Sequence, residues 1–122
     1  MLTYNESVGK WENENVPAGP DLVAPNTKTA NHTLVITDAG TAIEVNSGSA
    51  VTITVPANSS VAFPIGTVIE VAQVGAGQIT LAYADSVTLN SADGLLATRT
   101  QYSTLTLRKS ATDTWLVAGD LA

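Results

Sequence analysis

The side chains that could support catalysis or metal binding are few in this chain of 122 residues. The sequence contains no cysteine and one histidine, His32. The lack of cysteine excludes disulfide frameworks, thiolate metal sites and cysteine nucleophiles. Serine–histidine triads and most zinc sites need at least one histidine, usually with further ligands. His32 lies between Asn31 and Thr33 at the entrance of a predicted strand, and we interpret it as a surface or strand-edge histidine.

Paired carboxylates are the other candidate chemistry, because glycoside hydrolases use two carboxyl groups about 5–10 Å apart. Each acidic residue considered lies in a predicted turn or on a polar strand face, which favours solvated charge. Glu44 and Glu70 occupy opposite-looking positions of separate predicted strands. Residues 85–93 offer oxygen ligands but lack the carboxylate spacing of a calcium loop. The candidates are Asp38, Glu44, Glu70, Asp85, Asp93, Asp113 and Asp120. We predict no catalytic residue, no cofactor and no metal, and we expect that the protein is not an enzyme.

The overall charge bears on which partners the chain could bind. Charged residues make up 13% of the sequence, with a net charge of −6 and a pI near 4.3. This balance argues against nucleic acid and anionic membranes as partners. No window approaches the 18 apolar residues of a membrane span, and the first residues lack the pattern of a signal peptide. We therefore expect no membrane insertion.

Strand signals dominate residues 30–122, which we predict to be one domain. Apolar residues alternate with threonine, serine and asparagine, as in half-buried strands. The alternating segments are 51–55, 67–73, 78–83, 87–90 and 103–108, and the continuous apolar runs are 33–37 and 114–117. Gly75-Ala76-Gly77 joins two of these segments, which favours a hairpin there. We predict an all-β fold, an antiparallel β-sandwich or a jelly-roll-like barrel.

Residues 1–29 differ from the rest, because they show no sustained alternation of apolar and polar residues. We predict that they form an extended N-terminal arm for attachment. Aromatic side chains on a polar arm have little local core to join, and such anchors carry much of the binding energy at protein interfaces. The candidate docking residues are Leu2, Tyr4, Trp11, Val16, Leu22 and Val23.

The aromatic residues of the predicted domain have other expected roles. Trp115, within a continuous apolar run, is expected in the core. Tyr83 and Tyr102 could bury their rings while their hydroxyl groups stay in contact with water.

Several segments resemble, in the same order, a module of tailed-bacteriophage structural proteins that recurs in tail fibres, head fibres and related virion appendages. The segments are 51–67 (VTITVPANSSVAFPIGT), 73–80 (QVGAGQIT), 101–103 (QYS) and 114–121 (TWLVAGDL), with weaker likeness at 33–34 and 38–43. The stretch over which these segments are spread, residues 33–121, makes up about three-quarters of the chain. Residues 9–13 (GKWEN) are similar to short linkers that precede phage fibre domains.

The resemblance implies a structural protein of the phage virion, exposed on the particle surface. A short chain that starts at Met1 with almost no shaft suits a capsid decoration (cement) protein or a short head fibre. The expected partners are other virion proteins, either the major capsid protein or a tail component, and the expected assembly is a homotrimer. Ile65, Leu95 and Leu96 could lie between subunits or belong to the core. The alternative is a tail-fibre tip domain that binds a host receptor or glycan. A third hypothesis, a glycan-degrading enzyme, requires two carboxylates in one cleft.

Overall fold

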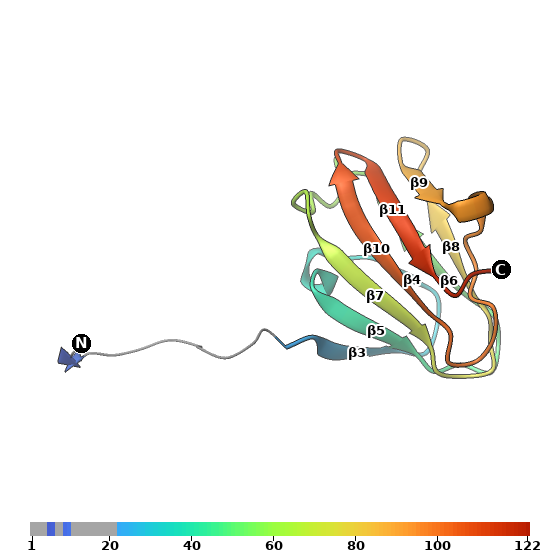
Figure 1. Cartoon of the computed structure of the whole chain (residues 1–122), viewed down its shortest axis with the longest axis horizontal. Coiled ribbons are helices and arrows are strands. Elements are labelled where there is room, and N and C mark those ends of the chain that lie inside the picture. Colours follow the sequence, from blue (N-terminus) through green and yellow to red (C-terminus); the bar gives the residue numbers. More distant parts are fainter. Residues whose placement is uncertain (1–4, 7–8, 11–21) are drawn as a thin grey trace.

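The computed structural model describes residues 5–6, 9–10 and 22–122 (Figure 1). β1 (Asn5–Glu6) pairs antiparallel with β2 (Gly9–Lys10). The other strands are β3 (Ala24–Lys28), β4 (His32–Thr33), β5 (Thr41–Val45), β6 (Val51–Val55), β7 (Val68–Gln73), β8 (Ile79–Tyr83), β9 (Thr88–Ser91), β10 (Thr104–Ala111) and β11 (Thr114–Gly119). Two short 3-10 turns, η1 (Ile36–Asp38) and η2 (Ala92–Gly94), interrupt them.

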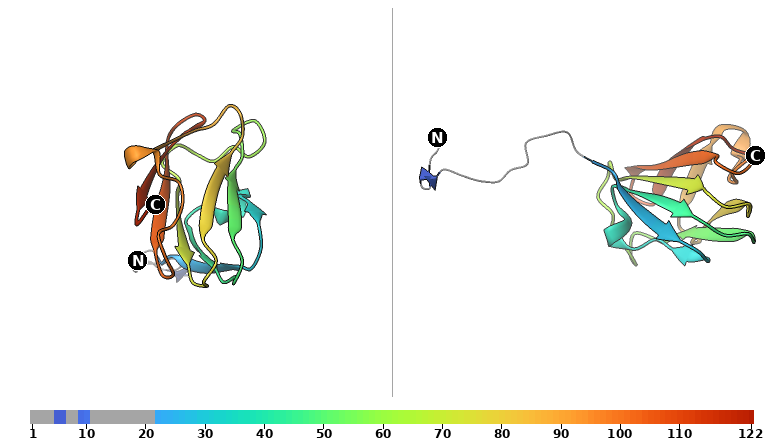
Figure 2. Two further views of the ribbon diagram at one scale, coloured as in Figure 1. Left: turned by 90° about the vertical axis from the view of Figure 1, so that its right-hand side faces the viewer. Right: turned by 90° about the horizontal axis from the view of Figure 1, so that it is seen from below.

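The strands from β3 onward form two sheets that face each other (Figure 2). The six-stranded sheet has the order β3-β5-β7-β10-β11-β9, and the three-stranded sheet has the order β4-β6-β8. From β3 to β8 the chain crosses to the other sheet after every strand. Each strand therefore lies parallel to the strand two places earlier in the chain. The hairpin β10–β11 then extends the larger sheet beside β7.

The prediction of an all-β sandwich is confirmed, but its strands are not uniformly antiparallel as expected. Among β3 to β11, only the β7–β10 and β10–β11 pairs are antiparallel. The other pairs of the six-stranded sheet are parallel, and so are both pairs of the three-stranded sheet. The reason is the repeated crossing between sheets, because a strand that returns to its own sheet after one excursion runs in the original direction. Residue alternation shows which faces of a strand are buried, but it does not show which strand is the neighbour.

The hairpin predicted at Gly75-Ala76-Gly77 is wrong, because this segment carries the chain from one sheet to the other. It stacks on the crossover between β5 and β6, and the Gly77 amide donates to the Ser47 carbonyl at 2.8 Å. A Cβ atom on Gly75 or Gly77 would overlap the backbone of Ser47 or Ser49. The two glycines thus allow the close approach of two crossovers.

The core fills the space between the two sheets, as the alternation predicts. Val51, Ile53 and Val55 are buried, whereas the intervening threonines are partly exposed. Trp115 is buried as predicted, at 1% exposure, and packs edge-on against Phe63 with ring centroids 5.5 Å apart. Burial of each such side chain contributes about 1.5–3 kcal/mol.

The sheet begins within the segment predicted as an arm. Residues 24–28 form β3, which pairs in register with β5 from Ala24↔Thr41 to Lys28↔Val45. The sequence Ala-Pro-Asn-Thr-Lys shows no strand alternation because β3 is an edge strand. Its inward-facing Asn26 meets polar groups instead of the apolar core.

Candidate functional site

A groove lies beside the residues that precede β3, on the outer face of the six-stranded sheet. It has a volume of about 270 Å³, and its lining residues are Val23, Gly40, Thr41, Val68, Glu70 and Thr106. The register places Glu70 beside Thr106 on β10, so both side chains point away from the core. The groove is mostly apolar with one carboxylate, which suits an apolar or amphipathic partner surface.

The structure describes only part of the predicted docking arm. Leu2, Tyr4, Trp11 and Val16 lie outside the described residues. Leu22 and Val23 are 87% and 60% exposed, and Val23 forms one wall of the groove. These two apolar side chains therefore stand uncovered at the junction of arm and domain.

Next to this junction, a buried carboxylate ties together the first two strands of the domain. Asp38 is 2% exposed. Its carboxylate contacts the His32 Nε2 atom at 2.7 Å and accepts hydrogen bonds from the Asn26 side chain at 2.7 Å and the Val35 amide at 2.9 Å. The prediction that Asp38 is solvated is wrong. Its partners come from β3, β4 and the residue just before η1, which no sequence pattern places together. His32 does lie at a strand edge, in β4, as predicted.

The surroundings of Asp38 act on its pKa in opposite directions. Burial raises the pKa of the carboxyl, while the hydrogen bonds from Val35, His32 and Asn26 and the charge of His32 lower it. The net effect is a pKa below the ordinary value of 3.8. The ionised form is therefore the one that the fold stabilises, and we assign Asp38 a positioning role for the start of the sheet.

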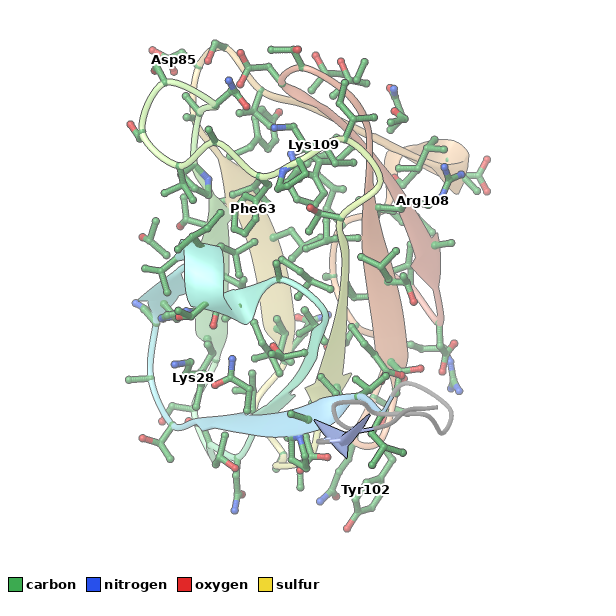
Figure 3. All side chains as sticks on the ribbon, turned by 90° about the vertical axis from the view of Figure 1, so that its left-hand side faces the viewer. Lys28, Phe63, Asp85, Tyr102, Arg108 and Lys109 are labelled. Atoms are coloured by element: carbon green, nitrogen blue, oxygen red, sulfur yellow. The ribbon has the colours of Figure 1, made fainter. Side chains whose placement is uncertain are left out.

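A second buried polar group, Lys109, fixes the loop between β6 and β7. Its side chain is 2% exposed and lies between the sheets beside Phe63, whereas the adjacent Arg108 points outward (Figure 3). The Lys109 Nζ atom donates to the Asn58 Oδ1 atom at 2.6 Å and to the Phe63 carbonyl at 2.7 Å, and lies 6.0 Å from the Trp115 ring centroid. The backbone amide of Asn58 in turn donates to the Asp113 carboxylate at 2.7 Å. Residues 58–63 are thereby held over the end of the core.

A third polar cluster joins the C-terminal strand to the turn before β10. Arg99 forms two hydrogen bonds with Asp120, at 2.7 and 2.9 Å, and the Ser103 hydroxyl donates to the same carboxylate at 2.7 Å. The hydrogen bonds from Arg99 and Ser103 lower the pKa of Asp120. The Arg99–Asp120 pair is exposed, whereas Ser103 is buried, and the arrangement supports a structural tie between the two segments.

The remaining carboxylates do not form a pair in the described groove. Glu44 and Glu70 share the outer face of the sheet, contrary to their expected opposite placement, because β5 and β7 are neighbours. Strand spacing and rise put their Cα atoms about 8 Å apart, but only Glu70 lines the groove. Within residues 22–122, no three acidic or histidine side chains gather as metal ligands do.

No family model matches the sequence, and no curated protein or solved structure matches it either. The assignment of function therefore depends on the residues themselves. In the described part of the chain, no helix is long and apolar enough to cross a membrane.

The two tyrosines expected to bury their rings are instead exposed. Tyr83 is 51% exposed on β8, and Tyr102 is 73% exposed in the turn before β10. Tyr102 has a φ of +70°, a conformation that side chains other than glycine seldom adopt. That turn is held by the Tyr102 amide, which donates to the Gln73 carbonyl at 2.6 Å. The tyrosine ring therefore projects from one end of the sandwich, opposite the end that carries Asp85 (Figure 3).

The three residues considered for a subunit interface occupy different environments. Ile65 is 65% exposed in the loop between β6 and β7. Leu96 packs against the core, and its carbonyl accepts a hydrogen bond from the Leu81 amide at 2.8 Å. Leu95 is partly exposed. Leu96 is thus partly buried against the core, and all three residues stay predictions for an interface.

Proposed function

We propose that this protein is a structural component of a tailed-phage virion, a capsid decoration protein or short head fibre. It attaches through the residues before the sheet, projects the β-domain from the particle, and assembles as a trimer. The observation that carries the proposal is the ordered resemblance of segments 51–67, 73–80, 101–103 and 114–121 to a module of phage appendages.

The positions of the resembling segments support a structural role. Asn58 and Phe63, in the first segment, bind Lys109 and hold the loop over the core. Gly75 and Gly77, in the second, permit the close stacking of two crossovers. Ser103 and Asp120, in the last two, bond to each other. These resembling residues thus hold the framework together, which supports a structural role.

The exposed apolar residues at the arm junction support attachment through the N-terminal side. Leu22 and Val23 leave a large fraction of apolar surface in water, and apolar surface of this kind gains free energy when a partner covers it. Attachment at this end would leave the rest of the sandwich exposed on the surface of the particle.

The decisive experiment combines particle composition with a binding assay. Mass spectrometry of purified phage particles, separated into heads and tails, should detect the chain on heads. In a sedimentation assay with particles that lack the chain, the full chain should bind, whereas a variant without residues 1–23 should not. This deletion stops before β3, because removal of residues 24–28 would also remove a strand of the sheet. Equal binding by the deletion variant would reject the arm as the anchor.

A matched pair of substitutions separates a specific anchor from a general loss of affinity. Trp11→Ala changes an aromatic residue of the arm, and Tyr83→Ala changes an exposed aromatic residue of the domain. Anchor residues at interfaces cost about 2 kcal/mol or more when truncated, so Trp11→Ala should weaken particle binding at least tenfold. Tyr83→Ala should leave it unchanged.

The exposed tyrosines favour a second candidate, a tail-fibre tip domain that binds a host receptor or glycan. Tyr102 projects from one end of the sandwich with an exposed ring, and aromatic rings of this kind can stack on sugars. This function requires that the full chain binds host cells and that Tyr102→Ala reduces this binding. No binding across plausible hosts would reject it.

A further inference from the structure

The outer face of the six-stranded sheet has an unusual composition for a surface in water. Around β5, β7 and β10 no described segment lies over it, apart from Val23 at its rim. The register puts three alanines and two threonines on this face, namely Ala42, Ala72, Ala118, Thr104 and Thr106. Most of the remaining outward positions near the centre are apolar or charged.

Two larger apolar side chains lie on the same face in one row across the strands. Val68 on β7 pairs with Arg108 on β10, which pairs with Leu116 on β11. Val68 is 43% and Leu116 is 39% exposed. The charged residues of the central strands on this face are of both signs, with Glu44 and Glu70 on one side and Arg108 on the other. Although the chain has a net charge of −6, this face thus offers a cation as well as carboxylates, so opposite charges can pair between two copies.

We propose that copies of this chain pack against one another through this face, so that its occupant is a second copy of the same domain. Arg108 of one copy can then meet Glu70 or Glu44 of the next, while the small side chains allow the sheets to approach closely. This inference rests on the trimer proposed above and names the surface through which each copy meets its neighbours.

The start of the sheet adds a second argument for a copy as the occupant. Val23, the residue just before β3, lies at the rim of this face. Copies that pack through the face would therefore bring their preceding segments together at one place. A group of such segments presents several anchors to one partner, which raises the overall affinity without any new contact.

The area of the face sets how strongly the domains alone can associate. Six strands about 4.8 Å apart and about five residues long cover roughly 400 Å². A standard interface buries about 800 Å² on each partner. The sheet face alone thus supplies about half of a stable interface, and we expect association in the micromolar range, strengthened by the residues before β3.

The test measures self-association of the full chain by sedimentation equilibrium between about 1 and 500 µM, the range in which such interfaces dissociate. The full chain should form oligomers. Val68→Lys and Leu116→Lys should each raise the dissociation constant at least tenfold, because each buries an unpaired charge in the interface. The matched control is Tyr83→Lys, which places the same charge at an exposed apolar position of the three-stranded sheet and should associate like the unchanged protein.

A crosslinking measurement keeps the proposal testable if a lysine variant fails to fold. The chain lacks cysteine, so a single Thr106→Cys substitution near the centre of the face supplies one defined thiol. A short bifunctional maleimide should crosslink Thr106→Cys between copies and should not crosslink Tyr83→Cys. A monomeric full chain at 500 µM, or crosslinking at position 83 alone, would overturn the proposal. Binding of a monomeric chain to particles would reject this surface while the proposed virion function stands.

Discussion

Replacement of Lys109 by methionine tests whether a buried amine stabilises this fold. Methionine retains most of the aliphatic stem but removes the two hydrogen bonds that reach Asn58 and the Phe63 carbonyl. Hydrogen bonds to a charged group contribute about 1.5–3 kcal/mol each, and an amine near an aromatic ring adds about 0.5–2 kcal/mol.

The opposing effect is the cost of burying the amine, which is several kcal/mol. In Lys109→Met this cost disappears, but two carbonyl oxygens lose their donor, at about 1–3 kcal/mol each. The Phe63 carbonyl is buried and cannot turn to water, whereas the Asn58 side chain is partly exposed and can. We therefore expect a net loss of about 2–4 kcal/mol in the free energy of unfolding, a large part of the 5–15 kcal/mol typical of a domain.

The assay is urea unfolding followed by the fluorescence of Trp115, in a Trp11→Phe background so that one tryptophan reports. Arg108→Met is the matched control, because the neighbouring cation lies on the outer face and its loss should change stability by less than about 0.5 kcal/mol in dilute protein. Asn58→Ala and the double variant complete a cycle, and we expect a coupling energy above about 1 kcal/mol. Unchanged or increased stability of Lys109→Met would refute the reasoning, since the burial cost would then exceed the gain from both hydrogen bonds.

Three further predictions concern the crossovers and the buried polar groups. Gly77→Ala should destabilise the domain by more than about 3 kcal/mol in urea unfolding, because the new methyl overlaps Ser49, whereas Gly48→Ala, which has open space, should change little. Native contacts hold the pKa of Asp38 below 3.8. The ionised carboxylate therefore stabilises the fold above that pH, and this stabilisation is lost as the pH falls through the pKa of the folded state. An acid titration of stability should therefore be steeper below about pH 4 for the unchanged protein than for Asp38→Asn, and equal slopes would contradict this role. Thr98→Val should cost about 1–3 kcal/mol in thermal unfolding, because the buried Thr98 hydroxyl donates to Gln73; a Tm equal to that of the unchanged protein would exclude a stabilising bond.

The strands and their buried faces could be predicted from the sequence because alternation depends on local spacing. In 51–55 every predicted inward residue is buried, and Trp115 lies in the core. The pairing of the strands could not be predicted, since the same alternation fits parallel and antiparallel neighbours. The glycines at 75 and 77 suggested a tight turn, but their role depends on a backbone that lies about 28 residues earlier.

The buried polar residues were missed for a related reason. Asp38, Lys109 and Thr98 can be buried because each has hydrogen-bond partners inside the protein. For each of them, at least one partner lies 12 or more residues away in sequence. A pattern of residue types cannot identify such partners from one sequence. The one local signal was the position of Lys109, which occupies an inward place in the alternation of 104–111.

The parallel alignment of β3 with β5 has a mechanical consequence. Five residue pairs, from Ala24↔Thr41 to Lys28↔Val45, join the first strand to the domain. A pull applied before residue 24 along the axis of β3 loads these pairs in shear, so their hydrogen bonds must yield together and not one after another. Resistance to such a pull is set by the rate of forced unfolding and not by equilibrium stability. A domain tethered through this strand can therefore bear a sustained load along its attachment, even though its first strand is short and polar.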